Sequence, residues 1–137
     1  QLRGPDVTAR VSQVARLPEV RRWLLGVQRE LGRAGSLVAD GRDMGTVVFP
    51  DAEVKVFLVA DLEERARRRL RQDGVADPDE AAVRAEAARI RERDRVDSER
   101  EHSPLRRPDG ALEVDTTGLD FEAQVQRVLE AVAAVGR

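Results

Sequence analysis

The sequence predicts an α/β fold built on a parallel sheet, and three observations support this prediction. Short apolar runs at residues 37–39, 54–59 and 111–114 alternate with helical patterns, which is the order expected of parallel strands joined by helices. The run at 54–59 is apolar on both faces except at Lys55, as in a strand that helices cover on both sides. Polar loops follow two of the three runs, and ligands bind at that carboxyl edge in such folds.

Composition narrows the classes of protein to consider. The chain has 137 residues, enough for one compact domain. Its 26 acidic and 24 basic residues give a net charge of −2, so the basic surplus of a general nucleic-acid binder is missing. No apolar run approaches the roughly 20 residues that cross a bilayer. Cysteine is absent, which fits a reducing compartment. We therefore expect a cytoplasmic protein with neither nucleic-acid nor membrane partners.

Two further helices are expected to bury one apolar stripe each. Residues 19–33 and 121–135 carry apolar side chains at helical spacing. The side chains expected to point inward are Val20, Trp23, Leu24, Val27 and Leu31 in the first helix, and Phe121, Val125, Val128, Leu129 and Val132 in the second. A helix over residues 62–71 follows the strand at 54–59.

The helix expected over residues 77–100 changes character along its length. Asp77 suits the cap and Pro78 the first helical position. The apolar stripe of this helix consists of Val83, Ala87 and Ile90. The same steps then reach Asp94 and Asp97, so the apolar face becomes polar midway.

Arg93, Asp97 and Arg100 stand at positions i, i+4 and i+7 of the same helix, and therefore on one face. One interpretation is a solvated face with weak ion pairs within the helix. The other is a functional face that presents cations to an anionic ligand.

The loop after the first apolar run carries the sequence DGRDMGTVVFPD over residues 40–51. Arg42 offers a rigid fork that matches a phosphate. Asp40 and Asp43 are able to hold a metal or to accept hydrogen bonds from a ligand. The alternative is an ordinary turn after a strand, with a local Arg–Asp pair.

Two other features of this loop concern its backbone. Gly41 and Gly45 allow backbone shapes that other residues resist. Residues 47–49 are apolar and are expected to form a short buried extension before Pro50.

The phosphate-binding motif G-x-x-x-x-G-K-[ST] is absent from the chain. Lys55 is the only lysine, and it lies inside a predicted strand. The chain is therefore expected to be either a carboxyl-terminal portion of a longer protein or a protein without an ATP-cradling loop.

The loop at residues 40–51 resembles the signature of bacterial cytidylate kinases, and five other blocks match the family in order. The matching blocks are residues 12–15, 18–21, 40–51, 63–66, 92–100 and 115–119. The resemblance implies a P-loop NTPase-like, three-layer nucleoside monophosphate kinase fold, incomplete at its amino terminus. It divides the chain into the rest of the nucleotide-binding insertion with its following helix (1–35), core strands and a helix (36–71), a lid-like helical region (72–104), and a core strand with a closing helix (105–137).

The same resemblance implies roles for individual residues. The expected CMP ligands are Ser12, Arg21, Arg42, Asp43, Arg93, Asp97 and Arg100. Among these, Ser12, Arg21 and Asp43 resemble the residues that read cytosine. The expected catalytic residues are Arg42, Arg93 and Arg100. We expect Arg67 and Arg68 to approach the ATP phosphates, and Asp40 to hold Mg²⁺ through water.

The implied function is phosphoryl transfer from ATP to CMP or dCMP, giving CDP or dCDP in pyrimidine nucleotide metabolism. It requires Mg²⁺ and the P-loop segment, and the complete protein is expected to be a monomer. The alternative is a non-catalytic nucleotide-binding or interaction module that lacks the ATP loop. The coding sequence ahead of Gln1 distinguishes the two.

Overall fold

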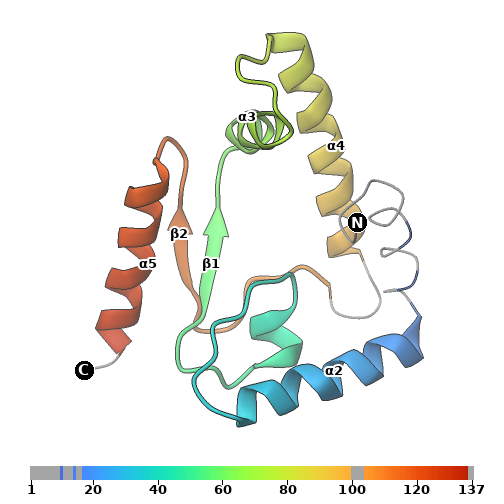
Figure 1. The fold of residues 1–137 in the computed structure, drawn as a ribbon, viewed down its shortest axis with the longest axis vertical. Helices are drawn as coiled ribbons and strands as arrows, with labels where there is room; N and C mark the ends of the chain where they lie inside the picture. The colour runs from blue at the N-terminus through green and yellow to red at the C-terminus, as the bar shows by residue number, and fades with distance from the viewer. Residues whose placement is uncertain (1–9, 11–13, 15–16, 100–103, 136–137) are drawn as a thin grey trace. The chain divides into compact units, whose positions relative to one another are not determined.

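A computed structural model describes residues 10, 14, 17–99 and 104–135 (Figure 1). The chain separates into two compact units, Gln1–Asp40 and Gly41–Arg137. The first unit contains helix α2. The second contains, in order, a π-helical turn η1, strand β1, helices α3 and α4, strand β2 and helix α5. Among the described residues, no helix has the length and apolar character needed to cross a membrane.

Helix α2 spans Pro18–Arg33, which confirms the helix predicted at 19–33. Pro18 lies in its first turn, where a missing N–H costs nothing. The predicted burial of its apolar stripe is wrong, because α2 has no buried residue and Trp23 is 66% exposed. Within the described part of this unit, α2 is the only helix or strand with assigned bounds, and most of its apolar stripe is exposed.

Residues 37–39 form no strand, contrary to the prediction, and Val38 is fully exposed. A strand depends on a neighbour that takes up its backbone N–H and C=O groups. Among the described residues the sheet contains only β1 and β2. An apolar run without a pairing strand therefore stays irregular.

The sheet of the second unit is parallel, as predicted. Strand β1 spans Val56–Val59 and β2 spans Leu112–Asp115. Val56 pairs with Leu112 and Val59 with Asp115, so both strands end at the same edge. Figure 1 shows the strands side by side, with α5 along β2. This arrangement brings the loops that follow β1 and β2 together.

Helices α3, spanning Leu62–Gln72, and α4, spanning Glu80–Ser98, pack against each other. Their shared core is formed by Ala66, Val83 and Ala87, with Leu62, Leu70 and Ile90 packed against it. This confirms the predicted apolar stripe of α4. The predicted cap is wrong: the carboxylate of Asp79, not Asp77, accepts a hydrogen bond from the Ala82 N–H at 2.7 Å. Pro78 thus precedes the cap, and the helix begins after it.

Helix α5 spans Phe121–Val135, as predicted. Its predicted inward face is only partly covered, since Phe121 is 74% exposed and Leu129 is 55% exposed. Among the described residues, the main contact of α5 is with β2, a strand of four residues. Such a short strand cannot cover the apolar face of a helix of 15 residues.

Candidate functional site

The π-helical turn η1, spanning Met44–Val48, shapes the loop that carries Arg42 and Asp43. The backbone carbonyl of Asp43 accepts hydrogen bonds from the N–H groups of Val47 at 2.9 Å and Val48 at 3.1 Å. Val48 is buried. The prediction that residues 47–49 bury apolar surface is thus right for Val48, but the segment is a helical turn and not a strand extension. Turns of this kind occur often at functional sites.

Gly45 is needed here for space and not for an unusual backbone angle. In the part of the chain that the structure describes, the glycines with positive φ are Gly35, Gly74, Gly110 and Gly118. A Cβ atom added at Gly45 would lie 2.7 Å from Cγ of Pro108. The loop therefore lies directly against the segment that leads into β2.

Arg42 extends from this loop to the carboxyl-terminal half of α4. Its Nε atom lies 3.4 Å from Oδ2 of Asp97, and its Nη1 atom lies 3.7 Å from Oδ1 of Asp94. Both are ion-pair distances. Arg42, which comes 52 residues before Asp94 and 55 before Asp97, thereby joins its loop to the polar half of the α4 stripe.

Two further arginines belong to this group. Arg65 of α3 makes a bidentate pair with Asp94, with Nη1 at 2.6 Å from Oδ2 and Nη2 at 3.1 Å from Oδ1. Nε of Arg93 lies 3.9 Å from Oδ2 of Asp97. We call these residues the Arg–Asp cluster: Arg42, Arg65, Arg93, Asp94 and Asp97. With three guanidinium groups and two carboxylates, it carries one net positive charge.

Burial differs across the Arg–Asp cluster. The side chain of Asp97 is 2% exposed, whereas that of Arg93 is 70% exposed. Asp97 therefore does not belong to a solvated face, although Arg93 does. A buried carboxylate requires compensating cations, and Arg42 and Arg93 supply them. The exposed guanidinium groups remain accessible to an anion.

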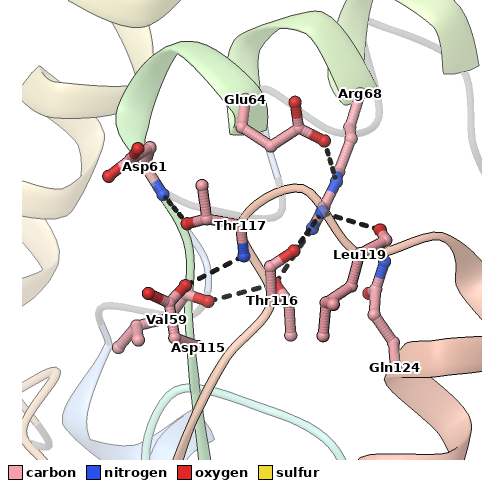
Figure 2. A network of polar contacts seen from close by, with 9 residues as sticks. All are labelled: Val59, Asp61, Glu64, Arg68, Asp115, Thr116, Thr117, Leu119 and Gln124. Atoms are coloured by element: carbon pink, nitrogen blue, oxygen red, sulfur yellow. Dashed lines mark hydrogen bonds and ion pairs between the residues drawn. The ribbon is translucent and has the colours of Figure 1, made fainter.

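A second polar network joins α3 to the edge where both strands end (Figure 2). Arg68 donates hydrogen bonds to the Thr116 hydroxyl at 3.0 Å, the Thr116 carbonyl and the Leu119 carbonyl at 3.3 Å. Glu64 accepts from its Nε atom at 2.9 Å. The Thr116 hydroxyl donates in turn to the Val59 carbonyl at 3.0 Å. Arg68 thus ties the loop after β2 to the helix after β1.

The next arginine of α3 is paired differently. Arg67 donates to the Glu80 carboxylate at 2.8 Å, close to the start of α4. The hydrogen bond and the charge of Glu80 raise the pKa of Arg67, and the same contacts lower the pKa of Glu80. Arg67 and Glu80 thus form an exposed ion pair between α3 and α4.

Comparison with known proteins identifies the family. A family model described as cytidylate kinase matches residues 1–134. The chain belongs to the cytidylate kinase family. It is 47% identical to a cytidylate kinase of Carboxydothermus hydrogenoformans over 131 residues, which are 96% of this chain and 59% of that relative. A cytidylate kinase of Bacillus cereus is 46% identical over 134 residues, with 98% and 59% covered.

The family also occurs in fused proteins. A bifunctional pantoate ligase/cytidylate kinase of Synechococcus elongatus is 51% identical over 131 residues, which are 93% of this chain and 24% of that relative. The chain spans about three fifths of the length of the cytidylate kinases of Carboxydothermus hydrogenoformans and Bacillus cereus. Membership of the cytidylate kinase family confirms the predicted P-loop NTPase-like α/β class.

The structure of this cytidylate kinase family member brings together three of the predicted site residues: Arg42, Arg93 and Asp97. Arg21 lies on α2 and Asp40 ends the first unit, so both belong to the other unit of the chain. Ser12 and Arg100 lie outside the described residues. The roles of these residues remain predictions.

Sequence reasoning assigned no role to Arg65 or Asp94, although both lie in the blocks that match cytidylate kinases. Asp94 was visible as a polar continuation of the α4 stripe. Arg65 has no comparable signal, because only the packing of α3 on α4 shows which of the α3 arginines faces Asp94.

Mg²⁺ is the metal predicted from the resemblance to cytidylate kinases. Among the described residues, no group of three or more His, Cys, Asp or Glu side chains is placed to hold a metal ion. Mg²⁺ is usually held by one or two carboxylates together with waters and substrate phosphates. The exposed carboxylate of Asp40 fits that mode as a single protein ligand.

Proposed function

We propose that this chain supplies the acceptor side of a cytidylate kinase, which transfers a phosphoryl group from ATP to CMP or dCMP. The observation that carries the proposal is the Arg–Asp cluster. It places Arg42 beside the buried Asp97 in a group with one net positive charge. Family membership supports CMP or dCMP as the nucleotide that such a site would take.

The chemistry of the cluster suits this reaction. Phosphoryl transfer depends mainly on positioning and on neutralising charge that develops on the phosphoryl oxygens. Arg42 and Arg93 present guanidinium groups for the CMP phosphate, and Asp97 is a carboxylate that accepts a hydrogen bond from a sugar hydroxyl. Arg100, which lies outside the described residues, is expected to supply a further cation for the phosphate.

The other assignments follow the family. Ser12, Arg21 and Asp43 read the cytosine edge, and Arg67 and Arg68 approach the ATP phosphates. Arg68 would have to release the carbonyls of Thr116 and Leu119 to do so. Asp40 would hold Mg²⁺ through water, and the ion would neutralise charge on the phosphates. Residues 72–104 act as the lid.

ATP binding requires a segment that these 137 residues do not contain. The motif G-x-x-x-x-G-K-[ST] is absent, and the relatives are longer than the chain. We infer that the remaining part of the protein supplies the phosphate-cradling loop. The complete protein then acts as a cytoplasmic monomer.

The test is ATP-dependent phosphorylation of CMP and dCMP, with UMP and AMP alongside. It compares the 137-residue chain with a version extended by the residues encoded ahead of Gln1. Turnover of CMP by the extended version alone supports the proposal. If neither version turns CMP over while CMP still binds, the protein is a non-catalytic nucleotide-binding module.

Calorimetric measurement of CMP binding tests whether the Arg–Asp cluster is the acceptor site. Arg42→Ala in the extended version should weaken CMP binding more than tenfold. Arg89→Ala on the exposed side of α4, where the side chain is 79% exposed, is the matched control and should leave binding unchanged. Equal binding by both variants would contradict the placement of the acceptor site.

A further inference from the structure

We propose that Arg65 is a positioning residue for CMP, which neutralises Asp94 and thereby leaves Arg42 available to the nucleotide phosphate. This inference rests on the proposed function, because it concerns how the same site receives its acceptor. Arg65 need not touch the nucleotide in this role.

The two arginines beside Asp94 differ in how tightly they hold it. Arg65 forms two hydrogen bonds, at 2.6 Å and 3.1 Å, one to each carboxylate oxygen. Arg42 lies 3.7 Å from Oδ1 of Asp94, which is too long for a hydrogen bond. A bidentate guanidinium–carboxylate pair is the stronger arrangement. Asp94 is therefore held mainly by Arg65.

The position of Arg65 is set by the packing of α3 on α4. Its neighbour Ala66 is fully buried and belongs to the core that also contains Val83 and Ala87. Asp94 lies about one helical turn beyond Ile90, which packs against the same core. The pair thus stands at the end of a packed helix interface, so its geometry is fixed before a nucleotide arrives.

Without Arg65, the carboxylate of Asp94 would lose its bidentate partner while Arg42 remains 3.7 Å away. Electrostatic attraction would then favour movement of the Arg42 guanidinium toward Asp94, where it would form the charge-assisted pair in place of Arg65. The phosphate of CMP would have to compete with that pair. Removal of Arg65 should therefore weaken CMP binding, because Asp94 competes with the phosphate for Arg42. This effect should disappear when Asp94 carries no charge.

A double-mutant cycle in the extended protein tests this coupling. The variants are Arg65→Gln, Asp94→Asn and the double variant, with CMP dissociation constants from calorimetry and KM values for CMP and ATP from kinetics. Arg69→Gln removes a charge from the exposed side of the same helix, where the side chain is 56% exposed. It should leave all these values unchanged.

We expect Arg65→Gln to raise the dissociation constant and the KM for CMP about tenfold, and to leave the KM for ATP unchanged. In the Asp94→Asn background the same substitution should change CMP binding less than threefold. If Arg65→Gln weakens binding equally in both backgrounds, or not at all, the inference is wrong. If the wild-type extended protein neither binds nor phosphorylates CMP, it is the proposed function that fails.

Arg65→Lys covers the case in which Arg65→Gln does not fold. Lysine keeps the charge but not the bidentate fork. The CMP dissociation constant of Arg65→Lys should therefore lie between that of the wild type and the roughly tenfold higher value expected for Arg65→Gln. Binding equal to the wild type would show that charge alone suffices. That result would overturn the role given to the bidentate pair.

Discussion

Nε of Arg42 lies 3.4 Å from Oδ2 of Asp97, and this contact joins the loop before η1 to the last turn of α4. The carboxylate is almost fully buried, whereas the guanidinium side chain is 39% exposed. The buried partner thus holds the exposed one in place. The arginine keeps a surface toward solvent from which it can bind an anion.

The first prediction concerns the charge of Asp97. Asp97→Asn in the extended protein should lower kcat/KM for CMP at least tenfold, because Arg42 and Arg93 lose the charge that orients them. Steady-state kinetics measure the effect, and Asp73→Asn at an exposed position of the chain is the control. Equal kinetics in the two variants would show that Asp97 has only a structural role.

The second prediction concerns base selection by Asp43. Asp43→Ala should weaken the preference for CMP over UMP, because a carboxylate accepts hydrogen bonds from the cytosine amino group and uracil has no such donor. The ratio of kcat/KM for the two nucleotides is the measurement, with Asp51→Ala as the control. A ratio that stays at the wild-type value would exclude Asp43 from reading the base.

The third prediction separates two roles of Arg68. Arg68→Met should lower the free energy of unfolding by about 1–3 kcal/mol, since the carbonyls of Thr116 and Leu119 lose a donor. Urea unfolding measures this, and Arg69→Met on the exposed side of α3 should change it little. A variant with unchanged stability but a raised KM for ATP would favour the phosphate role instead.

The fourth prediction concerns acid stability. The backbone N–H of Thr117 donates to the Asp115 carboxylate at 2.9 Å and lowers the pKa of that carboxyl below its ordinary value of 3.8. The contact therefore stabilises the fold above the ordinary pKa and is lost as the pH falls through the lowered one. Asp115→Asn should reduce the fall in melting temperature between about pH 5 and pH 3. Asp109→Asn is the control, and an identical fall in both variants would contradict the contact.

The fifth prediction concerns Gly45. Gly45→Ala should destabilise the protein by about 1–3 kcal/mol, because the new Cβ would meet the ring of Pro108 at 2.7 Å. Gly26→Ala on α2 is a contrasting control, since nothing lies within 4 Å of its added Cβ. It should stabilise the helix by up to about 1 kcal/mol. Thermal unfolding of both variants distinguishes crowding from a general effect of alanine.

The local pattern of apolar and polar residues was sufficient to predict most helices and strands of this chain. Helical spacing and Pro18 predicted α2, and the apolar run at 54–59 predicted β1. The stripe of α4 was predicted to change from apolar to polar after Ile90, with a solvated face and a functional face as the alternatives, and Asp97 on that face is buried. Such features follow from side-chain periodicity, which neighbouring residues determine.

Tertiary structure decided what depends on partners distant in the sequence. Residues 37–39 were expected to be a strand, but an apolar run becomes one only when another strand takes up its backbone hydrogen bonds. The stripes of α2 and α5 were expected to be buried, but burial needs a surface of matching size. Asp94 belongs to the site because α3 packs on α4 and places Arg65 opposite it. Periodicity shows which face of a helix is polar or apolar, and only packing shows what that face meets.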